Sequence, residues 1–85
     1  MIIYTVAAEG EFITFTNGNN KRSYRKQGIR EIITIGADGF LVLVNVDDKS
    51  MSYAYSEVED PTTGLAFTTL EEFRVYMLNN LLLHF

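Results

Sequence analysis

The chain has 85 residues, of which 47% are apolar and 21% are charged, and its formal net charge is −4. This length supports a single globular domain spanning residues 1–85, and the five Tyr and six Phe residues exclude a disordered tail. The lack of cysteine excludes a disulfide framework, a zinc ribbon and a thiol nucleophile.

The first part of the chain predicts three short strands. Residues 2–7 alternate between two faces, and residues 12–16 are rich in aromatic and β-branched side chains. A turn at Gly10 separates these two strands, and the Asn-Gly-Asn-Asn cluster at residues 17–20 predicts a second turn. We expect residues 21–27 to pair back as a third, highly charged strand.

Three more strands follow. Residues 31–35 and the apolar residues 40–46 flank an Asp-Gly pair at 38–39, which predicts a hairpin. Residues 40–46 are apolar on both faces, so this strand is expected in the middle of a sheet or beneath a helix. After a polar turn at 47–49, residues 50–56 alternate between large and small side chains.

The last segment predicts one helix over residues 69–83. A capping box is available in two registers, Thr68 with Glu71 or Thr69 with Glu72, and both glutamates suit the positive end of the helix dipole. A broad apolar stripe then follows at helical spacing. It comprises Leu70, Phe73, Met77, Leu78, Leu81 and Phe85.

Together, these elements predict an α+β fold. We expect a small antiparallel β-meander of four to six strands, packed on one C-terminal α-helix. The sheet would bury one face against the helical stripe, and residues 40–46 would lie near its centre.

Apolar residues outside the stripe are candidates for contact with a partner. They are Val75, Tyr76, Leu82 and Leu83. One helix on a small sheet buries one face, so these side chains need a second cover. Two covers remain open at this stage, the loop at residues 57–67 or a neighbouring subunit.

Charge is unevenly distributed along the chain. Residues 1–20 hold two acids and no base, residues 21–30 hold five bases and no acid, and residues 31–85 hold nine acids and two bases. The candidate basic patch comprises Lys21, Arg22, Tyr24, Arg25, Lys26 and Arg30. It could protect a sheet edge, meet an acidic protein partner, or contact phosphates while Tyr24 stacks on a base.

No pattern in the sequence indicates catalysis, a metal or a cofactor. The acidic clusters at residues 45–48 and 57–60 lack the ligand spacing of an EF-hand loop. His84 has no second histidine to share a metal, and a chain end holds a general base poorly. The serines lie outside any nucleophile-elbow pattern, and no glycine-rich phosphate loop occurs. We therefore expect no catalytic residue, no cofactor and no small-molecule substrate.

Two segments of the C-terminal half carry a recognisable pattern. They are Tyr55, Ser56, Glu57, Val58 and Pro61, and then Thr69, Leu70, Glu71, Glu72 and Phe73. This pattern resembles small structural proteins of tailed phages and prophages of Bacteroidetes, in which leucine usually occupies the place of Phe73. The resemblance implies a role in a virion or its assembly, and it leaves residues 1–30 unaccounted for.

The sequence therefore favours a non-enzymatic structural or interaction protein, a phage virion or assembly component that acts through protein–protein contacts or self-association. The alternatives are an accessory or regulatory protein that contacts nucleic acid through residues 21–30, and a small inhibitor of a host enzyme. The longest apolar run has five residues, far fewer than the roughly 18 of a membrane-spanning helix, so no membrane is expected. No export signal is visible, and we expect the protein in the virion or the host cytoplasm.

Overall fold

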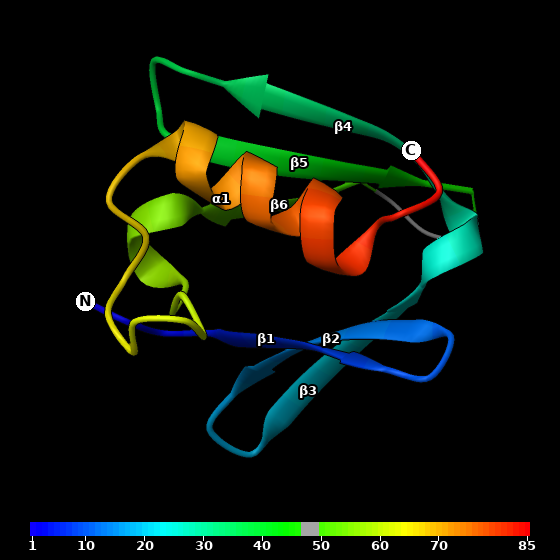
Figure 1. Ribbon diagram of the computed structural model, residues 1–85, viewed down its shortest axis with the longest axis horizontal. Coiled ribbons are helices and arrows are strands. Elements are labelled where there is room, and N and C mark those ends of the chain that lie inside the picture. Colours follow the sequence, from blue (N-terminus) through cyan, green and yellow to red (C-terminus); the bar gives the residue numbers. More distant parts are fainter. Residues whose placement is uncertain (47–49) are drawn as a thin grey trace.

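The computed structural model describes residues 1–46 and 50–85, so the polar turn predicted at residues 47–49 lies outside the described residues. The chain forms two three-stranded antiparallel sheets and one C-terminal helix (Figure 1). The predicted α+β class, with six strands in meander order, is confirmed. The expectation of one sheet is wrong, because the strands divide equally between two.

The first sheet is an antiparallel meander of β1 (Thr5–Glu9), β2 (Phe12–Asn17) and β3 (Asn20–Arg25). Two-residue turns join its strands, and each turn has a glycine with positive φ, 62° at Gly10 and 60° at Gly18. Glycine adopts this backbone conformation without the steric penalty of a Cβ atom. Both predicted turns are therefore confirmed.

The second sheet follows the one-turn 3-10 helix η1 (Lys26–Gly28). It consists of β4 (Ile29–Ile35), β5 (Phe40–Asn45) and β6 (Met51–Ala54), and β5 is its central strand, as the sequence predicted. A second 3-10 turn, η2 (Tyr55–Glu57), leads out of this sheet towards the helix.

The predicted hairpin between β4 and β5 is confirmed. Ile35 pairs with Phe40, so residues 36–39 form a four-residue turn. Gly39 closes this turn with φ 73°, and a Cβ atom at this position would lie 2.9 Å from the ring of Tyr55. The ring of Tyr55 therefore adds a steric reason for glycine to the conformational one.

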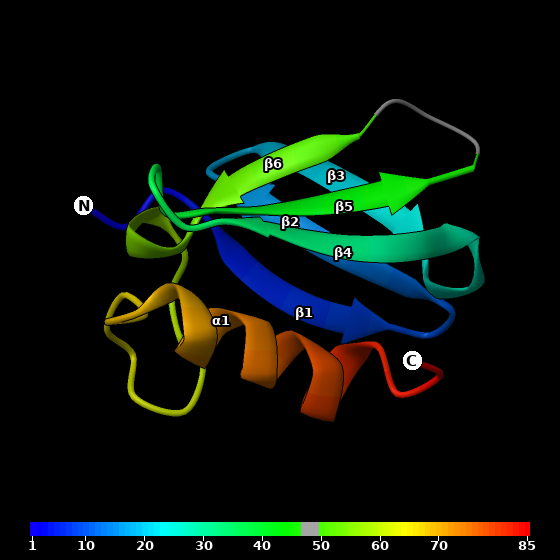
Figure 2. The same cartoon turned by 90° about the horizontal axis from the view of Figure 1, so that it is seen from above.

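Aromatic side chains join the two sheets, which lie one above the other in Figure 2. Phe15 of β2 stacks on Tyr53 of β6 with ring centroids 3.9 Å apart and an interplanar angle of 6°. Tyr4 and Tyr24 meet Tyr53 edge-on, at 5.2 and 6.4 Å. The rings of Phe15, Tyr24 and Tyr53 are buried, and Tyr4 packs against them from the edge of the core. Burial of rings this large dominates the energetics of a small core.

The helix covers one side of this sandwich, where β1 and β4 lie (Figure 2). It consists of α1 (Leu70–Tyr76) and a wider π-helical turn, η3 (Met77–Leu81), so it ends two residues before the predicted end at 83. Phe73, Met77 and Leu81 of the predicted stripe are buried in the core. These three confirm the predicted packing, and Leu70 and Leu78 are half-buried. Phe85 is 51% exposed and lies beyond the end of the helix, so its place in the stripe was wrong.

The start of the helix uses one of the two predicted capping registers. The Thr69 Oγ1 atom accepts a hydrogen bond of 3.0 Å from the backbone N–H of Glu72. The Glu72 carboxylate turns to the hydroxyl of Thr68, which donates a hydrogen bond to it. The N-cap residue is therefore Thr69, and Thr68 supports the glutamate from outside the helix.

The loop at residues 57–67 covers part of the helix. Its last residue, Phe67, is buried and lies 5.0 Å from the ring of Phe73 and 5.6 Å from that of Tyr76. Asp60 anchors the loop, because its Oδ1 atom accepts hydrogen bonds from the N–H and the hydroxyl of Thr62. Of the two covers considered for Tyr76, the loop is therefore the one that the structure supplies.

Leu82 does not belong to an uncovered surface, contrary to the sequence-based expectation. Its N–H bonds to the Met77 carbonyl at 2.8 Å, which closes the wide turn, and its backbone then leaves the helix with φ −114° and ψ 60°. A regular helix would rotate Leu81 and Leu82 apart by about 100°. Here both side chains are buried in the core. By contrast, Val75 is 40% exposed and Leu83 is 72% exposed.

Replacement of Leu82 by alanine tests this burial. We expect Leu82→Ala to lower the free energy of unfolding by about 2–5 kcal/mol, because it leaves a cavity in the core. The matched variant Leu83→Ala removes an exposed side chain and should change it by no more than about 0.5 kcal/mol. Urea unfolding measures both values, and equal losses in the two variants would contradict the placement of Leu82.

Candidate functional site

The outward face of the second sheet is apolar and partly exposed. Leu41 and Leu43 of β5 point into the core and are fully buried. The alternate residues of β5 point away from the core, since successive side chains of a strand face opposite ways. No other element of the described residues lies over that face (Figures 1 and 2).

Cross-strand pairs build a continuous apolar surface on this face. Val42 of β5 lies opposite Ile33 of β4, and Phe40 lies opposite Ile35. The two isoleucines are 40% and 42% exposed. We define the outer apolar face as Ile33, Ile35, Phe40, Val42 and Val44. Phe40 and Val44 are half-buried, and Val42 at its centre is 9% exposed, so the two isoleucines are its exposed members. Its signal in the sequence is the strand at 40–46 that is apolar on both sides.

The four predicted partner-binding residues of the helix do not form one exposed surface. Leu82 is in the core, and Tyr76 is half covered by the loop. Burial, followed by the nearby Asp60 carboxylate, raises the pKa of the Tyr76 phenol above its usual value. Val75 and Leu83 remain exposed and are the two of this set still open to a partner.

The candidate basic patch is divided between two faces of the first sheet. Strand β3 pairs Arg22 with Phe15, whose side chain is buried, so Arg22 points to the side that faces the second sheet. Lys21 and Arg25 alternate with Arg22 and therefore point to the opposite side. Lys26 lies in η1, and Arg30 lies in β4 beyond it.

Tyr24 is unavailable for stacking on a base. Its side chain is 6% exposed, and its hydroxyl lies 2.5 Å from that of Tyr53. Base stacking needs an open ring face, so the proposed stacking role of Tyr24 is wrong. The ring that an arginine of this segment does approach is Phe12, whose centroid lies 5.6 Å from the guanidinium carbon of Arg25.

The five bases of residues 21–30 have no carboxylate partner within the described part of the chain. The ion pair found there joins Arg74 and Glu71 of the helix at 3.1 Å. Strand β3 is an edge strand, with a neighbour on one side only. Edge protection and contact with an acidic partner therefore both remain open for this segment.

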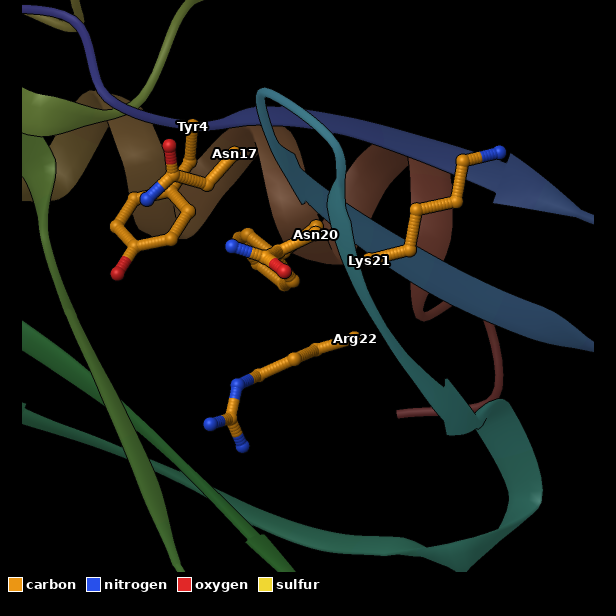
Figure 3. A pocket seen from close by; sticks show the side chains of 6 residues that line it. Tyr4, Asn17, Asn20, Lys21 and Arg22 are labelled. Carbon is orange, nitrogen blue, oxygen red and sulfur yellow. The ribbon is translucent and has the colours of Figure 1, made fainter.

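A half-open cleft of about 570 Å³ lies beside Arg22. Its lining residues are Tyr4, Phe15, Asn17, Asn20, Lys21 and Arg22. The side chains of Tyr4, Asn17, Asn20 and Arg22 point into one space, whereas Lys21 points away from it (Figure 3). No local sequence pattern predicts this cleft, because the cleft joins the turn at residues 17–20 with Tyr4, which is distant in the sequence.

A buried pair of tyrosine hydroxyls lies between the sheets. The hydroxyls of Tyr24 and Tyr53 share one hydrogen bond, in which either can be the donor. Burial raises the pKa of the Tyr53 phenol far above its usual value, and the hydrogen bond and charge of Tyr24 raise it further. The positive charge of Arg22 opposes this rise. The Tyr53 phenol therefore stays protonated well beyond neutral pH.

The described residues contain no group of three His, Asp or Glu side chains placed to hold a metal ion. In the acidic cluster at 57–60, Asp60 is occupied by hydrogen bonds within its own loop. The cluster at 45–48 lies partly outside the described residues. His84 is exposed and packs against Phe85, with ring centroids 4.5 Å apart.

Within residues 1–46 and 50–85, no helix combines the length and the apolar character needed to cross a lipid bilayer. A scan of protein-family models, a search of curated proteins and a search of solved structures each found no match to this chain.

The pKa of Tyr53 predicts how stability depends on pH. Above about pH 10, an unfolded chain loses the phenolic proton while the folded chain keeps it, so the free energy of unfolding should fall as pH rises. Tyr53→Phe should cost about 1–3 kcal/mol at neutral pH, because the Tyr24 hydroxyl is left unpaired. The same variant should lose less stability than the parent between neutral pH and about pH 11.

Urea unfolding of the parent and of Tyr53→Phe over this pH range measures the difference. The two curves should converge as pH rises, and a residual slope is expected from Tyr76. Parallel curves would show that ionisation of Tyr53 is not linked to folding.

Proposed function

We propose that the chain is a non-enzymatic interaction protein that docks on a protein partner, as a component of a phage virion or of its assembly. The observation that carries this proposal is the outer apolar face of the second sheet. The resemblance of the segments around Tyr55–Pro61 and Thr69–Phe73 to phage structural proteins supports the virion setting.

The physical argument rests on the position of the exposed side chains. Ile33 and Ile35 are neighbours on one face of an edge strand, and their partners across the ladder are apolar as well. Single exposed apolar residues are ordinary on a protein surface, but contiguous ones mark sites of interaction. Burial of such a patch gains roughly 25 cal/mol for each Å² removed from water. A protein partner supplies the cover that this chain's own elements do not.

Contact with nucleic acid through residues 21–30 is the second candidate. It is favoured by Lys21 and Arg25, which share one face of an edge strand and have no carboxylate partner in the described part of the chain. It is opposed by the burial of Tyr24 and by the net charge of −4. A small inhibitor of a host enzyme would use the same apolar docking, so the identity of the partner separates it from a virion component.

A photo-crosslinking amino acid at position 33, introduced in the source cells, tests the docking proposal. We expect Ile33 to give a covalent adduct with a defined protein, because the side chain at this position lies in the contact. Thr5 is the matched control, since it is exposed on an outer strand of the first sheet and faces away from the core.

Equal adducts at positions 33 and 5, or none at position 33, would contradict docking through the outer apolar face. A crosslinker at position 25 that captures nucleic acid would instead favour the second candidate. A captured capsid or tail protein would support the virion role, whereas a captured enzyme would support the inhibitor.

A further inference from the structure

The cleft beside Arg22 is rich in hydrogen-bond donors. The guanidinium of Arg22 offers five N–H groups, the amides of Asn17 and Asn20 offer two each, and the Tyr4 hydroxyl offers one. All four side chains point into the same space (Figure 3). No carboxylate is among the lining residues. The cleft therefore presents donors and a positive charge without a matching acceptor of negative charge.

These polar groups are not used within the described chain. None of the hydrogen bonds there involves the side chains of Asn17, Asn20 or Arg22, or the hydroxyl of Tyr4. Arg22 also has no ion pair there. Their convergence on one cleft therefore serves no bond within the described fold.

The backbone holds the donors in place before any ligand arrives. Asn17 and Asn20 are paired residues at the end of the β2–β3 ladder, and the tight turn at Gly18 joins them. Arg22 lies opposite Phe15, whose ring is fixed by its stack on Tyr53. A site mounted on paired strands loses little conformational entropy when a ligand binds.

We infer that this cleft binds a carboxylate, with Arg22 as its charged anchor and Asn17, Asn20 and Tyr4 as neutral donors. The guanidinium fork matches the two oxygens of a carboxylate, and such paired bonds are among the strongest that proteins make. A phosphate chain would need several cations, but Lys21 points away and the chain as a whole is acidic. This inference is independent of the outer apolar face.

The size of the cleft bears on the source of the carboxylate. Its volume of about 570 Å³ exceeds the space of a carboxylate alone and lies in the range of ordinary ligand sites. Two sources share this chemistry, an acidic side chain of a protein partner and a free organic acid. A short peptide and a small acid therefore form separate arms of the test.

Nuclear magnetic resonance titration measures binding at the donors themselves. The signals are the Arg22 Nε–H group and the side-chain amides of Asn17 and Asn20, recorded on the ¹⁵N-labelled full chain. The probes are a blocked glycine–glutamate peptide, the same peptide with glutamine, glutarate and inorganic phosphate. We expect saturable shifts at all three side chains with the glutamate peptide and none with the glutamine peptide. Binding of glutarate with equal or higher affinity would assign the site to a free organic acid.

Two variants separate a built site from general attraction between charges. Arg22→Gln should weaken binding of the carboxylate by about tenfold or more, because it removes the charged anchor. Lys21→Gln removes the same charge one residue away, on a side chain that points out of the cleft, and should leave the affinity within about twofold. Both substituted side chains are exposed, so both variants should fold, and circular dichroism checks this.

The inference is overturned if no probe gives saturable shifts at millimolar concentration, if both variants weaken binding equally, or if phosphate binds more tightly than either carboxylate. None of these outcomes depends on the adduct at Ile33. The failure of the carboxylate site and the failure of the docking proposal are therefore separate results.

Discussion

The stack of Phe15 on Tyr53 is the contact on which the fold depends, because it joins two sheets that share no strand. Each ring comes from a different sheet, and the hydroxyl of Tyr53 has a hydrogen-bond partner in Tyr24. Each sheet by itself is far smaller than the roughly 40 residues below which a chain seldom folds without disulfides, metals or oligomerisation. Packing the two sheets around a layer of aromatic rings gives a chain of 85 residues one shared core, which the helix then closes along one side.

This arrangement determines which surfaces stay open. Because the core lies between the sheets and the helix occupies their side, the outward face of the second sheet receives no cover from the described residues. Strand β5 is nevertheless apolar on that face, at Phe40, Val42 and Val44. The opposite edge of the sandwich gives Arg22 and its neighbours a cleft with unused donors. An apolar surface and a donor-rich cleft would give the chain two distinct means of recognition.

Local patterns predicted the elements well, and contacts between distant segments explain the rest. Alternation, turn residues and the cap at Thr69 identified six strands and the helix, because each signal depends on near neighbours. The division into two sheets depends on which faces meet, and no local pattern specifies that. The predicted exposure of Leu82 was wrong because the wide turn after Met77 changes the helical phase. The predicted exposure of Tyr24 was wrong because the charged strand buries this one aromatic ring. The chain does expose large apolar side chains, but they include Ile33 and Ile35 of the second sheet as well as Val75 of the helix.

Solvent paramagnetic relaxation of the isoleucine methyl groups in a dilute sample tests most directly whether the outer face is open. A soluble gadolinium chelate should relax the methyl groups of Ile33 and Ile35 strongly, while those of Ile13 and Ile29 stay protected between the sheets. This result would show that the chain closes its core alone and leaves Ile33 and Ile35 of the second sheet open to solvent. Protection of Ile33 and Ile35 equal to that of Ile13 in the monomer would contradict it.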